Sequence, residues 1–431
     1  MRLEAHDAVR PYDRVVAGPC RKVEPVADFH GDDVATLDEP ESDRPGGDDK
    51  HFVVVVDVRP VTMAWTIRPA PRIEALGTEA GVEVRSHRRI LAALDSAAMP
   101  GDEAPVLRYL SARDVERAMP PIDERLELAE RAMVSLATAE LPPKIAIHPR
   151  PDGSFAHVMP AHLRGDDDSG RGDLVGMKWI AGFPENRDRG LPALHGLVLL
   201  ADPLTGVPLA VLDAGPITAQ RTAAISGVAI AHFRPAVRGR EPRAALIGAG
   251  VQGHSHLDVL GRVLPGVRLT VFDRHPDRAE ELADAARATG GIGHAETAAS
   301  AREATARADV VVTAAAFGQR RQVMTPDWLT RDALVVPVDY ATYCSAVVAR
   351  ESALFVVDHR EQFIANRDAG LFEGYPDPAM TLGEAISNGV PRPPVGRVVV
   401  THLGVGLADL VFASAILERA IAGGRGEVLQ R

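Results

Sequence analysis

The hydrophobic pattern of the chain changes at about residue 240. From Arg243 onward, short β-branched runs alternate with segments of helical periodicity, which is typical of a parallel sheet with helices on both faces. After a strand that begins at Arg243, the next predicted strands of this sheet are Val267–Asp273, Val310–Ala314, Leu334–Asp339 and Leu354–Asp358. We therefore predict an α/β fold whose doubly wound parallel sheet, a Rossmann domain, spans residues 236–374.

Residues 105–235 follow another pattern, in which short strands are mixed with two helices. A Ser-x-x-Asp capping box at Ser111 predicts a helix through Ala118, and an amphipathic segment predicts a helix from about Ile122 to Ala139. The predicted strands are Pro105–Leu110, a short one near Ile145, Phe155–Met159, Leu174–Ile180, His195–Asp202 and Leu209–Asp213. The last two flank a turn-rich segment and form a predicted hairpin. This region is predicted to be a β-rich α+β domain.

The two ends of the chain lie outside these patterns. Residues 375–431 carry a helix near Leu382–Asn388, a strand at Val398–Thr401 and a helix from Leu407 to about Ile421, and we expect them to pack back on the β-rich layer. Residues 1–104 form an N-terminal extension. Its acidic, Pro- and Gly-rich segment 31–50 predicts disorder or an exposed loop, whereas His51–Val58 and Val61–Ile67 predict a pair of strands.

One stretch of the chain carries a dinucleotide-binding pattern. Gly248, Gly250 and Gly253 fit Gly-x-Gly-x-x-Gly between a predicted strand and a predicted helix. The first glycine permits a tight turn, the second lets the backbone approach a pyrophosphate, and the third lets the helix pack on the strand. The next strand ends in Asp273, where a ribose-binding carboxylate is expected. Asp273 favours NAD, although Arg274 could meet the 2′-phosphate of NADP; the alternative is a glycine turn that only closes the sheet.

Composition and charge narrow the choice of partner. The formal net charge is −11 and the pI is about 5.8, which argues against the basic face that nucleic acid or an anionic membrane needs. No apolar run reaches membrane-spanning length, and the charged N-terminus does not resemble a signal peptide, so we predict a cytoplasmic protein. Cys20 and Cys344 lie far apart in the sequence, so neither a disulfide framework nor a thiolate metal site is implied. We expect a small-molecule partner.

Two cations in apolar surroundings are candidate substrate-binding residues. Lys178 lies in the middle of an apolar predicted strand, where burial without a partner is costly. It either meets a substrate carboxylate or acts in proton transfer, or else it reaches the surface or forms a structural ion pair. Arg221 follows a predicted helix start with Thr218 as N-cap, where a cation has the wrong sign. This favours bidentate binding of a carboxylate by Arg221, with a solvated surface arginine as the alternative.

Asp339 ends a predicted strand of the parallel sheet, and ligands bind beyond the carboxyl ends of such strands. Its position makes it a candidate base, while a helix-capping or turn aspartate is the alternative. No metal site is predicted, because His254 and His256 are two residues apart on a predicted helix and do not share a face. The Asp166-Asp-Asp168 run predicts a solvated loop.

Lys178, the Thr-Ala-x-Arg-Thr-Ala-Ala segment around Arg221 and the Gly-Ala-Gly-Val-Gln-Gly turn make the chain similar to the ornithine cyclodeaminase and mu-crystallin family. Further matching motifs are Val158-Met-Pro-Ala161, Phe183-Pro-Glu-Asn186, Gly190-Leu-Pro192, Thr205-Gly206 and Leu403-Gly-Val-Gly-Leu-Ala-Asp409. The resemblance runs from about Val106 to the C-terminus. It implies a homodimer in which the β-rich domain supplies the substrate pocket and the subunit interface, and a Rossmann domain that holds NAD(P).

The resemblance also implies roles for individual residues. Lys178 and Arg221 match the family's binders of the substrate carboxylate, and Asp339 matches the acid that accepts and donates a proton at the substrate amine. Lys144 stands where the family has an arginine, which keeps the charge and loses the bidentate fork. His157 stands where cyclodeaminases have a glutamate, which puts recognition of an ornithine side-chain amine in question. The expected cofactor contacts are Gly248, Gly250, Val251, Gln252, Gly253, Asp273, Arg274, Thr222 and Thr313.

We therefore predict an NAD(P)-dependent oxidoreductase that transfers a hydride between nicotinamide and the Cα of an α-amino acid or its imine, as an amino-acid dehydrogenase or imine reductase. One alternative is a redox-neutral cyclodeaminase of the ornithine or lysine type that releases ammonia. Another is a non-catalytic, mu-crystallin-like binding protein or accessory subunit, which the N-terminal extension keeps open. Retention of Asp339, which mu-crystallin-like members lack, argues against it.

Overall fold

The computed structural model describes residues 106–165, 169–170, 172–316 and 321–430, together with two strands nearer the N-terminus. The chain divides into two compact units, residues 1–81 and 82–431. In the first unit, β1 (Phe52–Val58) and β2 (Val61–Ile67) pair antiparallel, which confirms the predicted pair of strands. The segment 31–50 and the Asp166–Asp168 run lie outside the described residues.

The second unit contains an eight-stranded parallel sheet in the order β11-β10-β9-β12-β13-β16-β14-β15. Its strands are β9 (Arg243–Ile247), β10 (Val267–Phe272), β11 (Ile292–Thr297), β12 (Val310–Thr313), β13 (Leu334–Pro337), β14 (Leu354–Val357), β15 (Met380–Thr381) and β16 (Val398–Thr401). The chain moves outward in one direction from β9 and in the other from β12. Ligands bind at such a switch point, beyond the carboxyl ends of the strands.

Helices cover both faces of the parallel sheet, as the doubly wound prediction required. Those on one face are α4 (Ala214–Phe233), α5 (Val251–Val263), α6 (Pro276–Arg287) and α10 (Leu382–Ser387). Those on the other are α7 (Ala301–Thr305), α8 (Ala346–Arg350) and α9 (Arg360–Asp368), with a 3-10 turn, η2 (Pro326–Trp328), beside α7. Because both faces are covered, every residue of the central strands β12 and β13 is buried.

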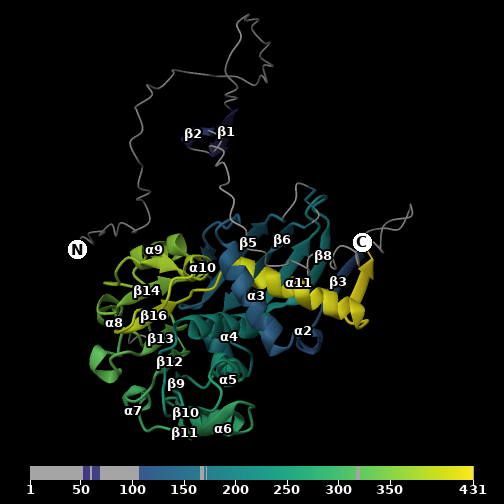
Figure 1. The fold of residues 1–431 in the computed structure, drawn as a ribbon. Helices are drawn as coiled ribbons and strands as arrows, with labels where there is room; N and C mark the ends of the chain where they lie inside the picture. Colours follow the sequence, from purple (N-terminus) through teal and green to yellow (C-terminus); the bar gives the residue numbers. More distant parts are fainter. Residues whose placement is uncertain are drawn as a thin grey trace, which may run out of the picture. The chain divides into compact units, whose positions relative to one another are not determined.

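A seven-stranded sheet forms the second layer system, in the order β17-β3-β8-β7-β6-β5-β4. Its strands are β3 (Val106–Leu110), β4 (Ile145–Ile147), β5 (Phe155–Leu163), β6 (Leu174–Gly182), β7 (Leu194–Ala201), β8 (Pro208–Asp213) and β17 (Glu427–Gln430), with a 3-10 helix, η1 (Pro184–Arg189), after β6. The apolar helix α11 (Gly406–Ala422) lies across β5, β6 and β7, and α2 (Ala112–Ala118), α3 (Ile122–Ser135) and α4 pack beside it (Figure 1). The predicted β-rich layer and its hairpin are confirmed.

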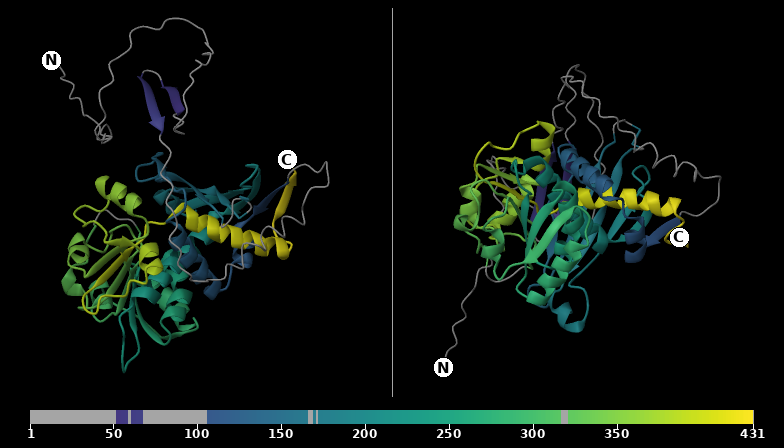
Figure 2. Two further views of the ribbon diagram at one scale, coloured as in Figure 1. Left: turned by 45° about the horizontal axis from the view of Figure 1, so that its top comes forward. Right: turned by 60° about the horizontal axis from the view of Figure 1, so that its bottom comes forward.

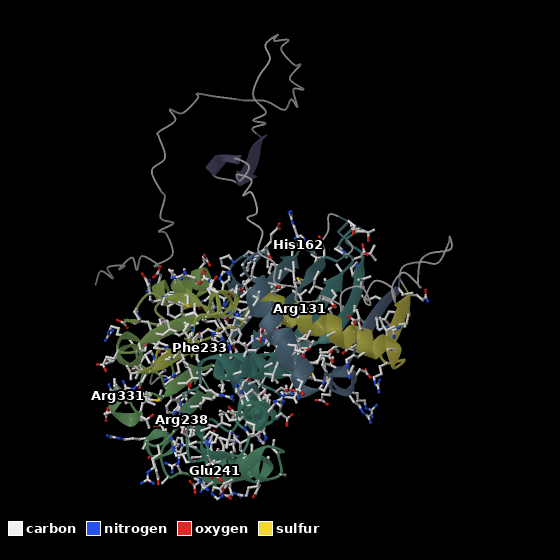
Figure 3. The ribbon with its side chains drawn as sticks, in the orientation of Figure 1. Arg131, His162, Phe233, Arg238, Glu241 and Arg331 are labelled. Atoms are coloured by element: carbon white, nitrogen blue, oxygen red, sulfur yellow. The ribbon has the colours of Figure 1, made fainter. Side chains whose placement is uncertain are left out.

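The two sheets form neighbouring lobes of the second unit, with α11 running across the seven-stranded one (Figure 2). Helix α4 starts at the end of β8 and ends at Phe233, which is fully buried. Figure 3 labels Phe233, and also Arg238 and Glu241 on the connection from α4 to β9. One chain segment therefore passes from the seven-stranded sheet to the parallel sheet through α4. Within the described part of the chain, no helix is long and apolar enough to cross a membrane.

Several predicted elements need correction. Helix α4 begins at Ala214 with Asp213 as its N-cap, not at Thr218, because β8 leads into the helix without a loop and the Asp213 carboxylate accepts from the Gly215 N–H. The strand Val398–Thr401 lies inside the parallel sheet, between β13 and β14, and not on the β-rich layer. The final helix does pack on the β-rich layer. Helix α3 ends at Ser135, four residues before the predicted end.

Candidate functional site

Two cations and one carboxylate meet where β6, α4 and α11 pack together. Lys178 Nζ lies 2.6 Å from Asp409 Oδ2, and Arg221 Nε donates to Asp409 Oδ1 at 3.0 Å. Lys178 faces α11 because its register partners Met159 and Val198 are on the covered face of the sheet. All three charged side chains are at least 94% buried. The cluster is thus built around a shared, buried carboxylate.

The charged groups of this cluster change one another's pKa values. Burial lowers the pKa of Lys178 to about 7, with Arg221 and Lys144 adding to the effect and Asp409 opposing it. Burial alone would raise the pKa of Asp409, but Arg221 and Lys178 outweigh it and hold that pKa below its usual range. Asp409 is therefore a carboxylate at neutral pH, whereas Lys178 is able to exchange its proton near neutrality.

This geometry excludes a surface position for both cations, which was one of the alternatives. Lys178 does not reach the surface; it forms the ion pair that was one of the alternatives, so its part in substrate binding stays a prediction. Arg221 lies in the third turn of α4, and not in the first turn or on the surface. Asp409 therefore balances its charge, and the prediction that Arg221 lies at the helix N-terminus was wrong.

The guanidinium group of Arg221 lies against Gly404. A Cβ atom at position 404 would be 2.5 Å from Nη1 and 2.6 Å from Nη2 of Arg221, and the glycine has φ of +79°. Its backbone is held on both sides, because its N–H donates to Asp358 Oδ2 at 2.7 Å and its carbonyl accepts from Gln362 Nε2 at 3.1 Å. Only glycine fits this place without displacing Arg221.

Lys144 joins the substrate side of the site to the parallel sheet. Its Nζ donates to the Leu403 carbonyl at 2.7 Å and to Tyr340 Oη at 2.9 Å, and Tyr340 Oη donates to the same carbonyl. Tyr340 and Ala341 have φ of +51° and +60°, and the Thr342 N–H donates back to the Asp339 carbonyl at 3.1 Å. Two consecutive left-handed residues cost energy. Tyr340, the hydrogen-bond partner of Lys144, is thus in the same turn as Asp339.

His157 lies on β5 close to the same charges. Its ring stacks on Phe155 with centroids 4.6 Å apart. Burial, together with Lys144, His148 and Lys178, lowers the pKa of His157 to about 4. The ring is therefore neutral at pH 7 and adds no further positive charge to the pocket.

The glycine turn fits the backbone of a dinucleotide. Gly248 has φ of +109°, and a Cβ there would be 2.5 Å from the Ala314 carbonyl oxygen at the end of β12. A Cβ at Gly253 would clash with the Gly248 carbonyl, whereas Gly250 has no atom within 4 Å of its Cβ position. Gly250 is also the N-cap of α5, and Val251 after it is 73% exposed. The helix start is thus open for a phosphate group.

The other predicted cofactor residues surround this turn. Asp273 Oδ2 accepts from the Ala249 N–H at 2.8 Å, so the carboxylate lies against the glycine turn. Arg274 is exposed and bonds His275, which leaves both cofactors compatible with the site. Thr222 on α4 and Thr313 at the end of β12 are buried, and Gln252 lies in the first turn of α5. Among the described residues, no group of three potential metal ligands comes together.

Polar atoms are buried at the carboxyl ends of three adjacent strands. Burial raises the pKa of Asp339, which follows β13, to about 7, although the Thr313 hydroxyl and nearby backbone N–H groups oppose the shift. The Asp339 carboxyl group faces these donors, whereas the Thr401 hydroxyl and His402 Nδ1 have no hydrogen-bond partner within the described ranges. Buried polar atoms without a protein partner need water, an ion or a ligand to complete their hydrogen bonds, or they store strain at a functional place.

Three of these site residues were missed in the sequence. Asp409 had a signal, because it is the acidic residue of an otherwise apolar helix segment and two buried cations need an anion. Thr401 and His402 had a weaker one: they follow a strand of the parallel sheet, but that strand was assigned to the wrong layer. The structure therefore extends the predicted site along the edge of the sheet to β16.

The parallel sheet with a glycine turn at its switch point is a dinucleotide-binding fold of the Rossmann type, here joined to a second sheet that carries the buried cluster of cations around Asp409. The chain belongs to the ornithine cyclodeaminase/mu-crystallin family, whose model matches residues 108–423. This membership and the mixed α/β fold confirm the two main predictions from the sequence.

Three relatives illustrate the family. The chain is 34% identical over 336 residues to nodulation efficiency protein NfeD of Rhizobium meliloti, covering 76% of this chain and 99% of that protein. It is similar to the structure of Thermococcus litoralis Delta(1)-pyrroline-2-carboxylate reductase in complex with NADH and L-proline, with a TM-score of 0.65, 27% identity and coverage of 74% and 99%. It is also similar to an archaeal alanine dehydrogenase dimer with bound NAD, with a TM-score of 0.64, 26% identity and coverage of 75% and 99%.

Proposed function

We propose that this protein is an NAD(P)-dependent oxidoreductase that moves a hydride between nicotinamide and the Cα of an α-amino acid or its imine. The observation that carries the proposal is the buried Lys178–Asp409–Arg221 cluster. Lys144, whose charge acts on Lys178, bonds Tyr340, the residue after Asp339. The two solved relatives support it, because one is a reductase of a cyclic imino acid and the other a dehydrogenase of an amino acid, and their structures hold NADH or NAD.

The cluster is suited to a substrate carboxylate. Of the three guanidinium nitrogens of Arg221, Nε alone has a hydrogen-bond partner among the described residues. Both Nη groups are therefore left to bind a carboxylate in a bidentate manner. Lys144 and Lys178 add positive charge, and Asp409 balances one of the three cations. The pocket therefore carries net positive charge in a buried place, which favours a bound anion.

Asp339 is the residue that we expect to exchange a proton with the substrate nitrogen. In the oxidative direction bound NAD would accept the Cα hydride with its electron pair, and Asp339 would accept an amine N–H proton, so that the imine is formed. NAD supplies the hydride acceptor when it is bound. A pKa near 7 suits a group that must hold a proton in one direction and accept it in the other. In reverse, protonated Asp339 donates to the nitrogen while the imine is reduced.

The experiment that tests this proposal follows reduced cofactor and ammonia together. Purified protein is incubated with NAD or NADP and a panel of amino acids that includes alanine, ornithine and lysine, and separately with NADH or NADPH and cyclic imines. Ammonia with accumulating NADH indicates a dehydrogenase, and consumption of NADH with imines indicates a reductase. Ammonia without net NADH would replace the proposal by a cyclodeaminase, and silence in every arm would contradict catalysis at this site.

We also propose that the protein is a homodimer through the uncovered face of its seven-stranded sheet. Apolar side chains on this face are solvent-exposed in the single chain: Ile145, Met177, Trp179 and Leu197. Alternate residues of the same strands face α11, so this second apolar face has no helix over it among the described elements. An apolar surface of this kind on a sheet is typical of a subunit interface, and the related alanine dehydrogenase is a dimer.

Light scattering on a sizing column tests the dimer. Wild type should have the mass of two chains, and Trp179→Glu should shift the mass toward one chain because it places a charge in the apolar face. Leu204→Glu is the matched control, since Leu204 is 60% exposed in the turn after β7. A Trp179→Glu protein that stays dimeric would contradict this interface.

A further inference from the structure

A buried chain of hydrogen bonds, which the proposed reaction does not use, connects α5, α4 and the end of β16. His256 Nδ1 lies 2.6 Å from the Gln252 carbonyl, His256 Nε2 lies 2.9 Å from Ser226 Oγ, and Ser226 Oγ lies 2.9 Å from His402 Nε2. Ser226 and His256 are fully buried and His402 is 4% exposed. Such a network inside an apolar core is expensive unless its members are matched to one another.

The donors and acceptors of this network can be assigned in only one way while both rings are neutral. The Gln252 carbonyl can only accept, so His256 Nδ1 carries the proton and His256 Nε2 is an acceptor. Ser226 therefore donates its hydroxyl proton to His256 and accepts from His402 Nε2–H. Burial lowers the pKa of both histidines, that of His256 to about 4, so both are neutral at pH 7. His402 is left with an unprotonated Nδ1.

This Nδ1 has no hydrogen-bond partner in the described part of the chain. His402 follows β16 in the middle of the parallel sheet, and Val398 and Val400, which precede it on the same side of the strand, belong to the core shared with α4 and α5. The positive charge of Arg221 contributes to the low pKa of His402, and Gly404, two residues on, touches that guanidinium. The free acceptor thus lies between the cofactor helix and the carboxylate pocket.

We propose that His402 Nδ1 accepts a hydrogen bond from the carboxamide N–H of the bound nicotinamide, and that the Ser226–His256 pair holds His402 in the tautomer this requires. The inference rests on the proposed function, which places the nicotinamide ring beside the substrate. The carboxamide N–H is a neutral donor and suits the neutral acceptor His402 Nδ1. The substrate amine is a less suitable donor, because the proposed reaction pairs it with Asp339. The network starts at the Gln252 carbonyl in the first turn of α5, the helix at whose start we expect the phosphates of the cofactor.

Two isosteric variants separate the two nitrogens of His402. His402→Gln can still donate an amide N–H to Ser226 but has no acceptor at the position of Nδ1. His402→Asn keeps an amide oxygen near the position of Nδ1 but does not reach Ser226. The affinities of NADH and of ADP-ribose, which lacks the nicotinamide, are measured for each protein by calorimetry, without turnover.

The expected result is selective. His402→Gln should weaken NADH binding about five- to tenfold, the effect of one hydrogen bond, and leave the affinity for ADP-ribose unchanged, while His402→Asn should bind NADH within about twofold of wild type. Equal losses for both ligands, or no loss in His402→Gln, would overturn the proposal. If His402→Gln does not fold, Ser226→Ala, which frees the tautomer of His402, should show the same selectivity and otherwise overturns it. Wild type that binds no NADH would instead contradict the proposed function.

Discussion

The two sides of the site differ in how their polar groups are matched. On the substrate side, Lys178 and Arg221 share Asp409, and Lys144 is bonded to Tyr340 and to a carbonyl. On the expected cofactor side, the Thr401 hydroxyl and His402 Nδ1 are buried and have no hydrogen-bond partner within the described residues. A buried polar group without a partner costs about 1–3 kcal/mol. We therefore expect the first side to be formed before any ligand binds and the second to be completed by a ligand.

The largest effect should come from removing the anion that balances the substrate side. Asp409→Asn leaves Arg221 without its buried anion and Lys178 without the carboxylate that raises its pKa, so the free energy of unfolding should fall by about 3–5 kcal/mol. Lys178→Met is the matched control, because it leaves Arg221 and Asp409 as a one-to-one pair, and it should abolish turnover with a much smaller loss of stability. Urea denaturation at pH 7 measures both. Equal losses in the two variants would mean that the cluster is not held by Asp409.

Asp339→Asn should have the next largest effect, and it acts on activity and stability in opposite directions. Turnover should fall about 10²–10⁴-fold, because the proton acceptor is lost. The raised pKa means that folded Asp339 keeps its proton between about pH 4 and pH 7, whereas the unfolded chain has lost it. Wild-type stability contributed by this group therefore falls as pH rises through that window.

Denaturation at several pH values checks this sign. The free energy of unfolding of Asp339→Asn minus that of wild type should increase as the pH rises from about 4 to 7. Above pH 7 this difference should change little. In wild type, the oxidative rate should rise with pH through about 7 and the reductive rate should fall. A pH-independent difference in stability between the two proteins would contradict burial as the cause of the shift.

Two glycine variants should separate the two sides. Gly404→Ala pushes on the Arg221 guanidinium, so the KM of the amino acid should rise about 10–100-fold while NADH binding stays the same. Gly250→Ala fits the protein itself but projects a methyl group into the space at the start of α5, so it should weaken NADH binding and spare substrate affinity at saturating cofactor. The reverse pattern, or parallel losses, would show that the sides are not independent.

The smallest effect is expected for specificity. His157→Glu places a carboxylate near Lys144 and Lys178, in a position where the neutral ring adds no charge now. The ratio of kcat/KM for ornithine or lysine over alanine should rise by about three- to tenfold, the size of one modest polar contact. His157→Gln is the neutral control and should leave that ratio unchanged.

Much of the fold could be predicted, because local signals agreed with it. The glycine turn, the strands of β-branched residues and the Ser111 capping box each specify their conformation over a few residues. The strand Val398–Thr401 was placed in the wrong layer because an apolar strand carries no mark of which sheet it joins. The start of α4 was missed because Asp213 serves both as the end of β8 and as the helix cap.

The site was predictable residue by residue but not as an arrangement. Asp339 and the cations Lys178 and Arg221 could be singled out, since charge in an apolar run is conspicuous. That both cations share Asp409 depends on a contact between residues 188 or more positions apart along the chain. The tautomer of His402 depends on two further helices, so no sequence pattern near it carries the information.

The edge of the seven-stranded sheet has a further consequence. Strands β3 and β17 pair antiparallel, so that Val106 lies opposite Gln430 and the two ends of the 106–430 region are adjacent. A circular permutant that joins residue 430 to residue 106 through a short linker, with new termini in an exposed turn, should therefore retain the architecture. The first and last strands of the 106–430 region are paired in one sheet, so the fold does not depend on where along this region the chain begins.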